Sequence, residues 1–197
     1  MIIADYEDEI RQIRELYNVA EADLKSVGRE QNVLIVAGVN QLRYAGQHLV
    51  RALAADDQAQ VEAELGASTR HAQRAIYDIN DAAIQFYLTE IKHFRSRYPV
   101  NLNLIVTNYE EVIGAVTQAS SNIEEASQSN RSNRELLYES VRVDVVALRN
   151  AYRTLEASVP DVTSAVQAQN RTILKTWAYI AVVVVSIAIS VAQFLSS

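Results

Sequence analysis

The most restrictive feature of this sequence is an uncharged, apolar stretch that follows Lys175. A helix of about 19 such residues spans roughly 28 Å, which matches a bilayer hydrocarbon core of about 30 Å. Trp177 and Tyr179 stand in its first turn, where aromatic rings favour the membrane interface. Arg171 and Lys175 precede the stretch, and no basic residue follows it. We therefore predict one C-terminal transmembrane helix over residues 176–195, with the N-terminal bulk in the cytoplasm.

Small residues recur along the predicted span and indicate a second role for it. Small side chains let transmembrane helices approach closely, and hydroxyl groups facing lipid are unfavourable. Self-association within the membrane is one interpretation, and simple tolerance of Ala and Ser in a single span is the other. The residues expected to form the anchor and its interface are Lys175, Trp177, Tyr179, Ala181, Ser186, Ala188, Ser190 and Ala192.

The rest of the chain has the pattern of long amphipathic helices. Only 5 Gly and 2 Pro occur in 197 residues, too few turn residues for a multi-stranded sheet. Apolar residues recur at alternating spacings of four and three, which is typical of helices with one buried face. We predict an all-α bundle of about five to six helices, the last of which continues into the span.

Local signals place the expected helix ends. Gly28 predicts a break before a second helix over about 31–55. Asp56 and Asp57 are suited to cap a third helix, which Pro99 would stop at about residue 98. Ser132 and Glu135 have the spacing of a capping box for a later helix. A final helix is expected to run unbroken from Asp161 to Leu195, with Pro160 in its first turn.

These signals divide the chain into three parts. Residues 1–98 form a predicted cytoplasmic helical domain, and residues 100–175 a coiled-coil-like helical region. Residues 176–195 form the predicted transmembrane helix. The apolar stripes of the middle part are short, so packing within one chain and packing between chains both remain open.

Several classes of chemistry have no support in the sequence. There is no cysteine, which removes disulfides, thiolate zinc sites and cysteine nucleophiles. The five isolated glycines cannot build a phosphate-binding loop. Glu90 and His93 form a single E-x-x-H, whereas a carboxylate-bridged metal site in a bundle needs two copies. The net charge of −6 argues against general nucleic-acid binding. We therefore expect no metal and no cofactor.

A short internal echo gathers the most suggestive polar residues. His48-Leu-Val-Arg51 is repeated as His71-Ala-Gln-Arg74, and a His and an Arg three residues apart share a helix face. If the two helices form an antiparallel hairpin, the copies meet. The histidines would then act as acid, base or phosphate contact, with the arginines holding an anion. The alternative is a structural network that fixes helix register. The expected network comprises Tyr44, His48, Arg51, His71, Arg74 and Asp78.

The spacing Arg43-x4-His48, in a small helical domain over about residues 31–98, resembles the R-x4-6-H motif of the HEPN superfamily. The resemblance implies a helical-bundle ribonuclease, usually dimeric, in which Arg43 holds the RNA phosphate and His48 is the acid–base group. A membrane-anchored version is also similar to HEPN-like accessory effectors of anti-phage and CRISPR systems, which assemble into pores and depolarise the membrane.

Three functions follow as expectations. The first is a non-enzymatic membrane effector that oligomerises through its cytoplasmic helices and permeabilises the membrane in anti-phage defence, with lipid and further copies of itself as partners. The second is a tail-anchored tether or scaffold that binds a cytoplasmic protein. The third is a membrane-bound HEPN-like RNase, the one case in which nucleic acid is a partner.

Overall fold

A computed structural model describes residues 5–31, 34–128 and 137–195. These residues form six α-helices and a short 3-10 helix over Leu102–Leu104, and they contain no β-strand. The prediction of an all-α bundle is therefore confirmed. The helices are α1 (Glu7–Gln31), α2 (Val36–Leu53), α3 (Gln58–Arg97), α4 (Tyr109–Gln128), α5 (Tyr138–Ala157) and α6 (Val159–Leu195).

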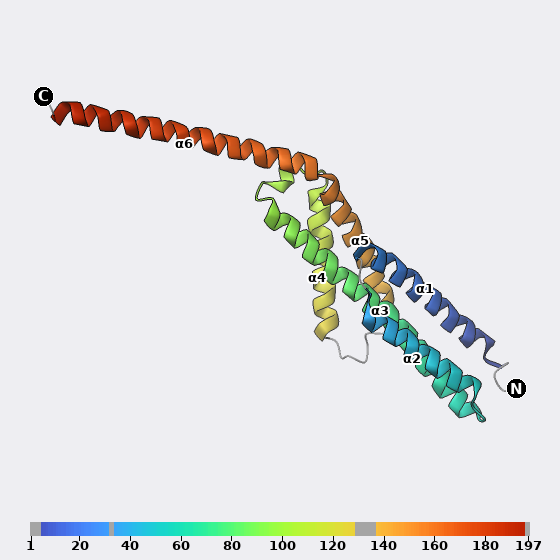
Figure 1. The fold of residues 1–197 in the computed structure, drawn as a ribbon. Helices are drawn as coiled ribbons and strands as arrows, with labels where there is room; N and C mark the ends of the chain where they lie inside the picture. Colours follow the sequence, from blue (N-terminus) through green and yellow to red (C-terminus); the bar gives the residue numbers. More distant parts are fainter. Residues whose placement is uncertain (1–4, 32–33, 129–136, 196–197) are drawn as a thin grey trace.

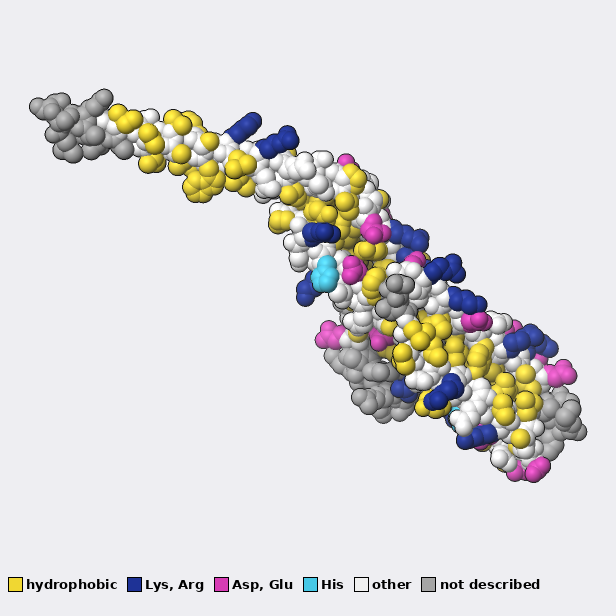
Figure 2. All heavy atoms as spheres, in the orientation of Figure 1, with side chains coloured by type: hydrophobic (Ala, Val, Ile, Leu, Met, Phe, Trp, Pro, Cys, Tyr) yellow, Lys and Arg dark blue, Asp and Glu magenta, His cyan; other side chains and the backbone are white. Residues whose placement is uncertain are grey.

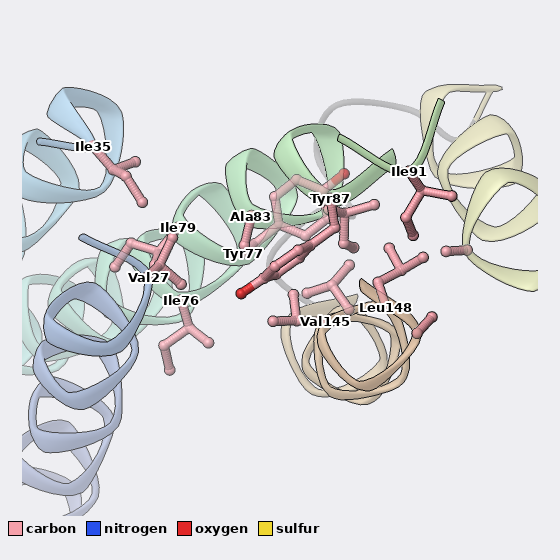
Figure 3. Packing of buried hydrophobic residues seen from close by; sticks show 14 of the residues in the cluster. Val27, Ile35, Ile76, Tyr77, Ile79, Ala83, Tyr87, Ile91, Val145 and Leu148 are labelled. Carbon is pink, nitrogen blue, oxygen red and sulfur yellow. The ribbon is translucent and has the colours of Figure 1, made fainter. Parts of the chain in front are cut away.

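The longest helix of the bundle, α3, is its central element (Figure 1). Helices α1 and α2 pack against its first part, α5 packs against its second part, and α4 packs on α5. Figure 3 shows Val145 and Leu148 of α5 beside Tyr87 and Ile91 of α3. Full burial of one such aliphatic side chain contributes about 1.5–3 kcal/mol, so α3 holds the two ends of the bundle together through its own core residues.

Helices α2 and α3 form an antiparallel pair that is packed through small residues. Gly38, Ala45 and Ala52 are all buried and recur at intervals of seven, which places them on one face of α2. The buried hydroxyl of Ser68 donates a hydrogen bond to the Ala45 carbonyl oxygen at 2.9 Å. Because this face carries almost no side-chain bulk, polar residues beside it on the two helices are brought into contact range.

The ends of α3 follow the local signals. The Asp57 carboxylate accepts a hydrogen bond from the Gln60 amide at 2.8 Å, as an N-cap residue does. The helix ends at Arg97, two residues before Pro99. Both predicted ends are confirmed, and α3 runs through Gly66 without interruption.

The predicted break at Gly28 is wrong, because α1 continues to Gln31. The last turn of α1 places Glu30 against Tyr87 and Arg149, and these contacts outweigh the low helix propensity of one glycine. The expected capping box at Ser132 and Glu135 lies outside the described residues.

Helix α6 is unbroken over 37 residues, as predicted, with Pro160 in its first turn. Val162 packs in the bundle core, and the remainder of the helix projects away from the bundle (Figure 1). Over the part of the chain that the structure describes, no helix is both long enough and apolar enough to cross a membrane. The side chains of Ala188, Ser190 and Ala192, which were expected at a membrane interface, lie outside the described residues.

Candidate functional site: a stacked histidine row and an exposed apolar helix

Helices α2 and α3 bring the two histidines of the sequence echo together. The rings of His48 and His71 are stacked, with centroids 5.2 Å apart and planes inclined by 12°. Each ring is half-buried between the helices. The pairing arises because the helices are antiparallel, so that a residue late in α2 faces one early in α3.

Each histidine is held by one hydrogen bond at Nδ1. His48 Nδ1 lies 2.6 Å from Glu64 Oε2, and His71 Nδ1 lies 2.8 Å from Gln41 Oε1. An amide oxygen only accepts hydrogen bonds, so His71 carries its proton on Nδ1. A neutral His71 therefore has its lone pair on Nε2, and a proton gained there would give the ring its positive charge.

The stack extends to Arg43 through Tyr44. The Tyr44 ring centroid is 5.5 Å from that of His71, and the Arg43 guanidinium lies 5.0 Å from the Tyr44 centroid. We call the four residues Arg43, Tyr44, His71 and His48 the stacked row. Arg43 and Tyr44 are exposed, so the row leads from a solvent-facing cation to a histidine held by the half-buried carboxylate of Glu64.

The surroundings of His71 disfavour its charged form. Burial lowers the pKa of His71, and the nearby positive charges of His48, Arg74 and Arg70 lower it further. The neutral form of His71 is therefore favoured over its charged form in this environment.

The remaining residues of the expected network differ in how deeply they are buried. Arg51 is exposed on α2. Arg74 is partly buried on α3, and its Nε has no hydrogen-bond partner among the described residues. Asp78 is also partly buried on α3. Arg43 lies over the Tyr44 ring and His48 stacks on His71, so the two residues of the R-x4-H spacing have different ring partners.

A second polar cluster joins α1 to α5 and was not predicted. Arg142 Nε lies 2.9 Å from Asp23 Oδ2, and Arg149 Nε lies 3.0 Å from Glu30 Oε2. Arg149 also donates to Ser26 Oγ at 2.9 Å, and the Tyr87 hydroxyl of α3 donates to Glu30. We call these ion pairs and their hydrogen bonds the α1–α5 clasp. An open cavity of about 530 Å³ lies beside it, between α1 and α5.

Burial and charge shift the titration of the clasp residues. Burial raises the pKa of Tyr87, and its hydrogen bond to Glu30 raises it further. Burial alone would lower the pKa of Arg149, but its interactions with Tyr87 and Glu30 outweigh that effect and raise it. The clasp therefore keeps a neutral tyrosine and a charged arginine at physiological pH, as a structural ion-pair network does.

The described part of α6 beyond the bundle exposes a run of large apolar side chains. Figure 2 shows this hydrophobic arm, with basic side chains where it begins. Trp177 is 65% exposed and Tyr179 71%, although tryptophan side chains are highly buried on average in folded proteins. The exposed large apolar residues of this segment are Ile173, Leu174, Trp177, Tyr179, Ile180, Val182, Val183, Val184, Val185, Ile187 and Ile189.

In the part of the chain that the structure describes, no group of three or more His, Cys, Asp or Glu side chains is arranged to hold a metal ion. No protein-family model matches the chain, and neither a curated protein nor a solved structure is significantly similar to it.

Proposed function

We propose that this chain is a non-enzymatic helical effector that anchors in a bacterial inner membrane, self-associates and permeabilises that membrane in anti-phage defence. The observation that supports the proposal most is the exposed apolar run on α6 between Ile173 and Ile189. A contiguous apolar surface of this kind marks a membrane or protein interaction site.

The order of residues along α6 favours lipid as the environment of this run. Arg171 and Lys175 come first, Trp177 and Tyr179 follow, and no charged residue appears later in the sequence. Basic residues followed by aromatic residues and then by an apolar stretch match the order of headgroup, interface and hydrocarbon. The proposed anchor is the whole stretch 176–195, whose final side chains lie outside the described residues.

The polar clusters of the bundle support a structural role over a catalytic one. His48 is held by Glu64 and His71 by Gln41, so each histidine has a protein partner at Nδ1. The Arg43 guanidinium lies over the Tyr44 ring and His48 is held by Glu64, whereas phosphodiester cleavage by the pair would need both groups at one phosphate. We infer that the stacked row stabilises the packing of α2 on α3, and that α6 produces the effect on the cell.

The test is membrane potential in bacteria that express three forms of the chain. These are the intact chain, the Val184→Arg variant, and a variant with Arg43→Ala and His48→Ala. An arginine at the centre of a span costs about 2.5–3.5 kcal/mol, whereas each Val or Ile contributes only about 0.3–0.6 kcal/mol. We expect depolarisation by the intact chain and by the double variant, and none by Val184→Arg.

Two other results would replace the proposal. If no form depolarises the membrane and the cells grow normally, a tether that binds a cytoplasmic protein becomes the better interpretation. Growth arrest that survives Val184→Arg but not the double substitution would instead indicate an RNase that uses Arg43 and His48. A matched Val50→Arg variant, changed at a valine of α2 that is 65% exposed where Val184 is 58% exposed, controls for the added charge.

A further inference from the structure

Helix α5 has a second apolar stripe in addition to the face that packs in the core. Val143 is 69% exposed and Val146 is 54% exposed, while Val145 and Leu148 of the same helix are buried. Ala147 and Asn150 are exposed beside the two valines. We call Val143, Val146, Ala147 and Asn150 the outer stripe of α5. Together with α1, the three apolar residues of this stripe line the open cavity of about 530 Å³.

The outer stripe has opposite charges at its two ends. Glu139 and Arg153 stand seven residues before and seven residues after Val146. Seven residues are about two helical turns, so the three side chains lie nearly on one line along α5. Glu139 is exposed, and the Arg153 side chain is 64% exposed while it also contacts Glu30. The stripe thus has an apolar centre, bordered by Arg142 and Arg149 of the clasp, between one negative and one positive end.

We propose that the outer stripe of α5 is the docking surface for a second copy of this chain, packed antiparallel about a two-fold axis at Val146. In a two-fold interface the same patch serves both subunits, so each contact between different residues occurs twice. Glu139 of each copy then faces Arg153 of the other, and Val146 faces Val146. The inference rests on the self-association in the proposed function and names its surface.

The charges decide the direction of packing. Parallel packing would place Glu139 against Glu139 and Arg153 against Arg153, two like-charge contacts at one interface. Antiparallel packing replaces both with opposite-charge contacts and keeps the valines together.

The absence of native cysteine allows a direct test on the full chain in detergent. Packed helix axes are 8–10 Å apart, so residues on a two-fold axis can reach the Cα separation of about 4.4–6.8 Å that a disulfide requires. We expect Val146→Cys to form an oxidised dimer efficiently. Val143→Cys, three residues off the axis, should cross-link several-fold less, and Leu104→Cys, exposed on the 3-10 helix, should give only background.

A charge exchange tests the direction of packing in the Val146→Cys background. Glu139→Arg or Arg153→Glu alone should each reduce the cross-linked fraction about fivefold, because each creates two like-charge contacts. The two substitutions together should restore it. Cross-linking of Val146→Cys no better than Leu104→Cys would overturn the proposal. Equal cross-linking from Val143→Cys and Val146→Cys would overturn the antiparallel arrangement.

The cross-linking test of the α5 interface is independent of the depolarisation test of the proposed function. Cross-linking in detergent does not depend on depolarisation, so a dimer without depolarisation would retain the α5 interface and remove the effector. Depolarisation by a chain that shows no cross-link at Val146 would retain the effector and remove this interface.

Discussion

Gly38 of α2 lies so close to Ile79 of α3 that a methyl group on Gly38 would collide with the Ile79 side chain. Both residues are buried, and α2 and α3 pack closely against each other at this point. The relationship explains why a glycine occupies the first turn of α2.

Gly38→Ala should therefore destabilise the bundle despite the better helix propensity of alanine. Overpacking in a core costs about 1–3 kcal/mol, and the propensity gain is at most about 1 kcal/mol. We expect a net loss of about 1 kcal/mol, within a range of roughly 0–2 kcal/mol, in the free energy of unfolding, measured by denaturant titration of the full chain in detergent. Gly114→Ala is the matched control, since a methyl group there meets no atom within 4 Å. It should stabilise by about 0.5–1 kcal/mol, and equal effects at both sites would contradict the packing argument.

Removing Arg149 should weaken the contact between α1 and α5. Arg149→Met removes one of the two arginines that pair with Glu30 and the guanidinium that donates to the Tyr87 hydroxyl, and hydrogen bonds to charged groups contribute about 1.5–3 kcal/mol. The pair is partly exposed, so we expect a loss of about 1–3 kcal/mol in the free energy of unfolding.

Lys25→Met is the control for Arg149→Met, because it breaks the pair between Lys25 and Glu21, whose side chains are 64% and 58% exposed. A surface pair of this kind contributes at most about 1 kcal/mol. If both variants unfold at the same denaturant concentration, the clasp adds no stability beyond a surface contact.

The ends of α3 could be predicted because they depend on local chemistry. Asp57 caps the helix through an amide three residues away, and Pro99 lacks the N–H that a continuing helix needs. Gly28 was misjudged because its effect on the helix is small compared with contacts that come from elsewhere in the chain. Glu30, two residues later, is held by Arg149, which is 119 positions away in sequence.

The candidate site was predicted only in part for the same reason. The echoed His and Arg residues indicated that His48 and His71 would face each other in a hairpin. Their hydrogen-bond partners, Glu64 and Gln41, are outside the echo and depend on the register of the two helices. No local pattern relates Asp23 to Arg142, so the α1–α5 clasp required the structure.

The stability of the α2–α3 pair should depend on pH through His71. Its folded pKa is lowered below the ordinary value of about 6.5 by burial and by His48, Arg74 and Arg70. The unfolded chain therefore binds the proton more readily than the folded chain. The contribution of His71 is fully present above about pH 6.5 and is lost as the pH falls toward the folded pKa.

We expect the unfolding free energy of the native chain to decrease between about pH 7.5 and 5, and His71→Gln to reduce that decrease. His93→Gln serves as the control, because His93 is 70% exposed and lies away from the stack near the end of α3. An unchanged pH dependence in His71→Gln, alongside a native response, would exclude His71 as its source.

The single tryptophan of the chain reports directly on the environment of α6. Trp177 is 65% exposed in the structure, so its emission in water should be that of a solvated indole. On reconstitution into phosphatidylcholine vesicles we expect a shift to shorter wavelength and quenching by brominated lipid, since an interfacial indole leaves bulk water. Val184→Arg should reduce the lipid quenching strongly, while Val50→Arg, changed at an exposed valine on α2, should leave it intact. Emission that stays at the solvated wavelength, with full access to aqueous iodide, would mean that the apolar run of α6 is covered by something other than lipid.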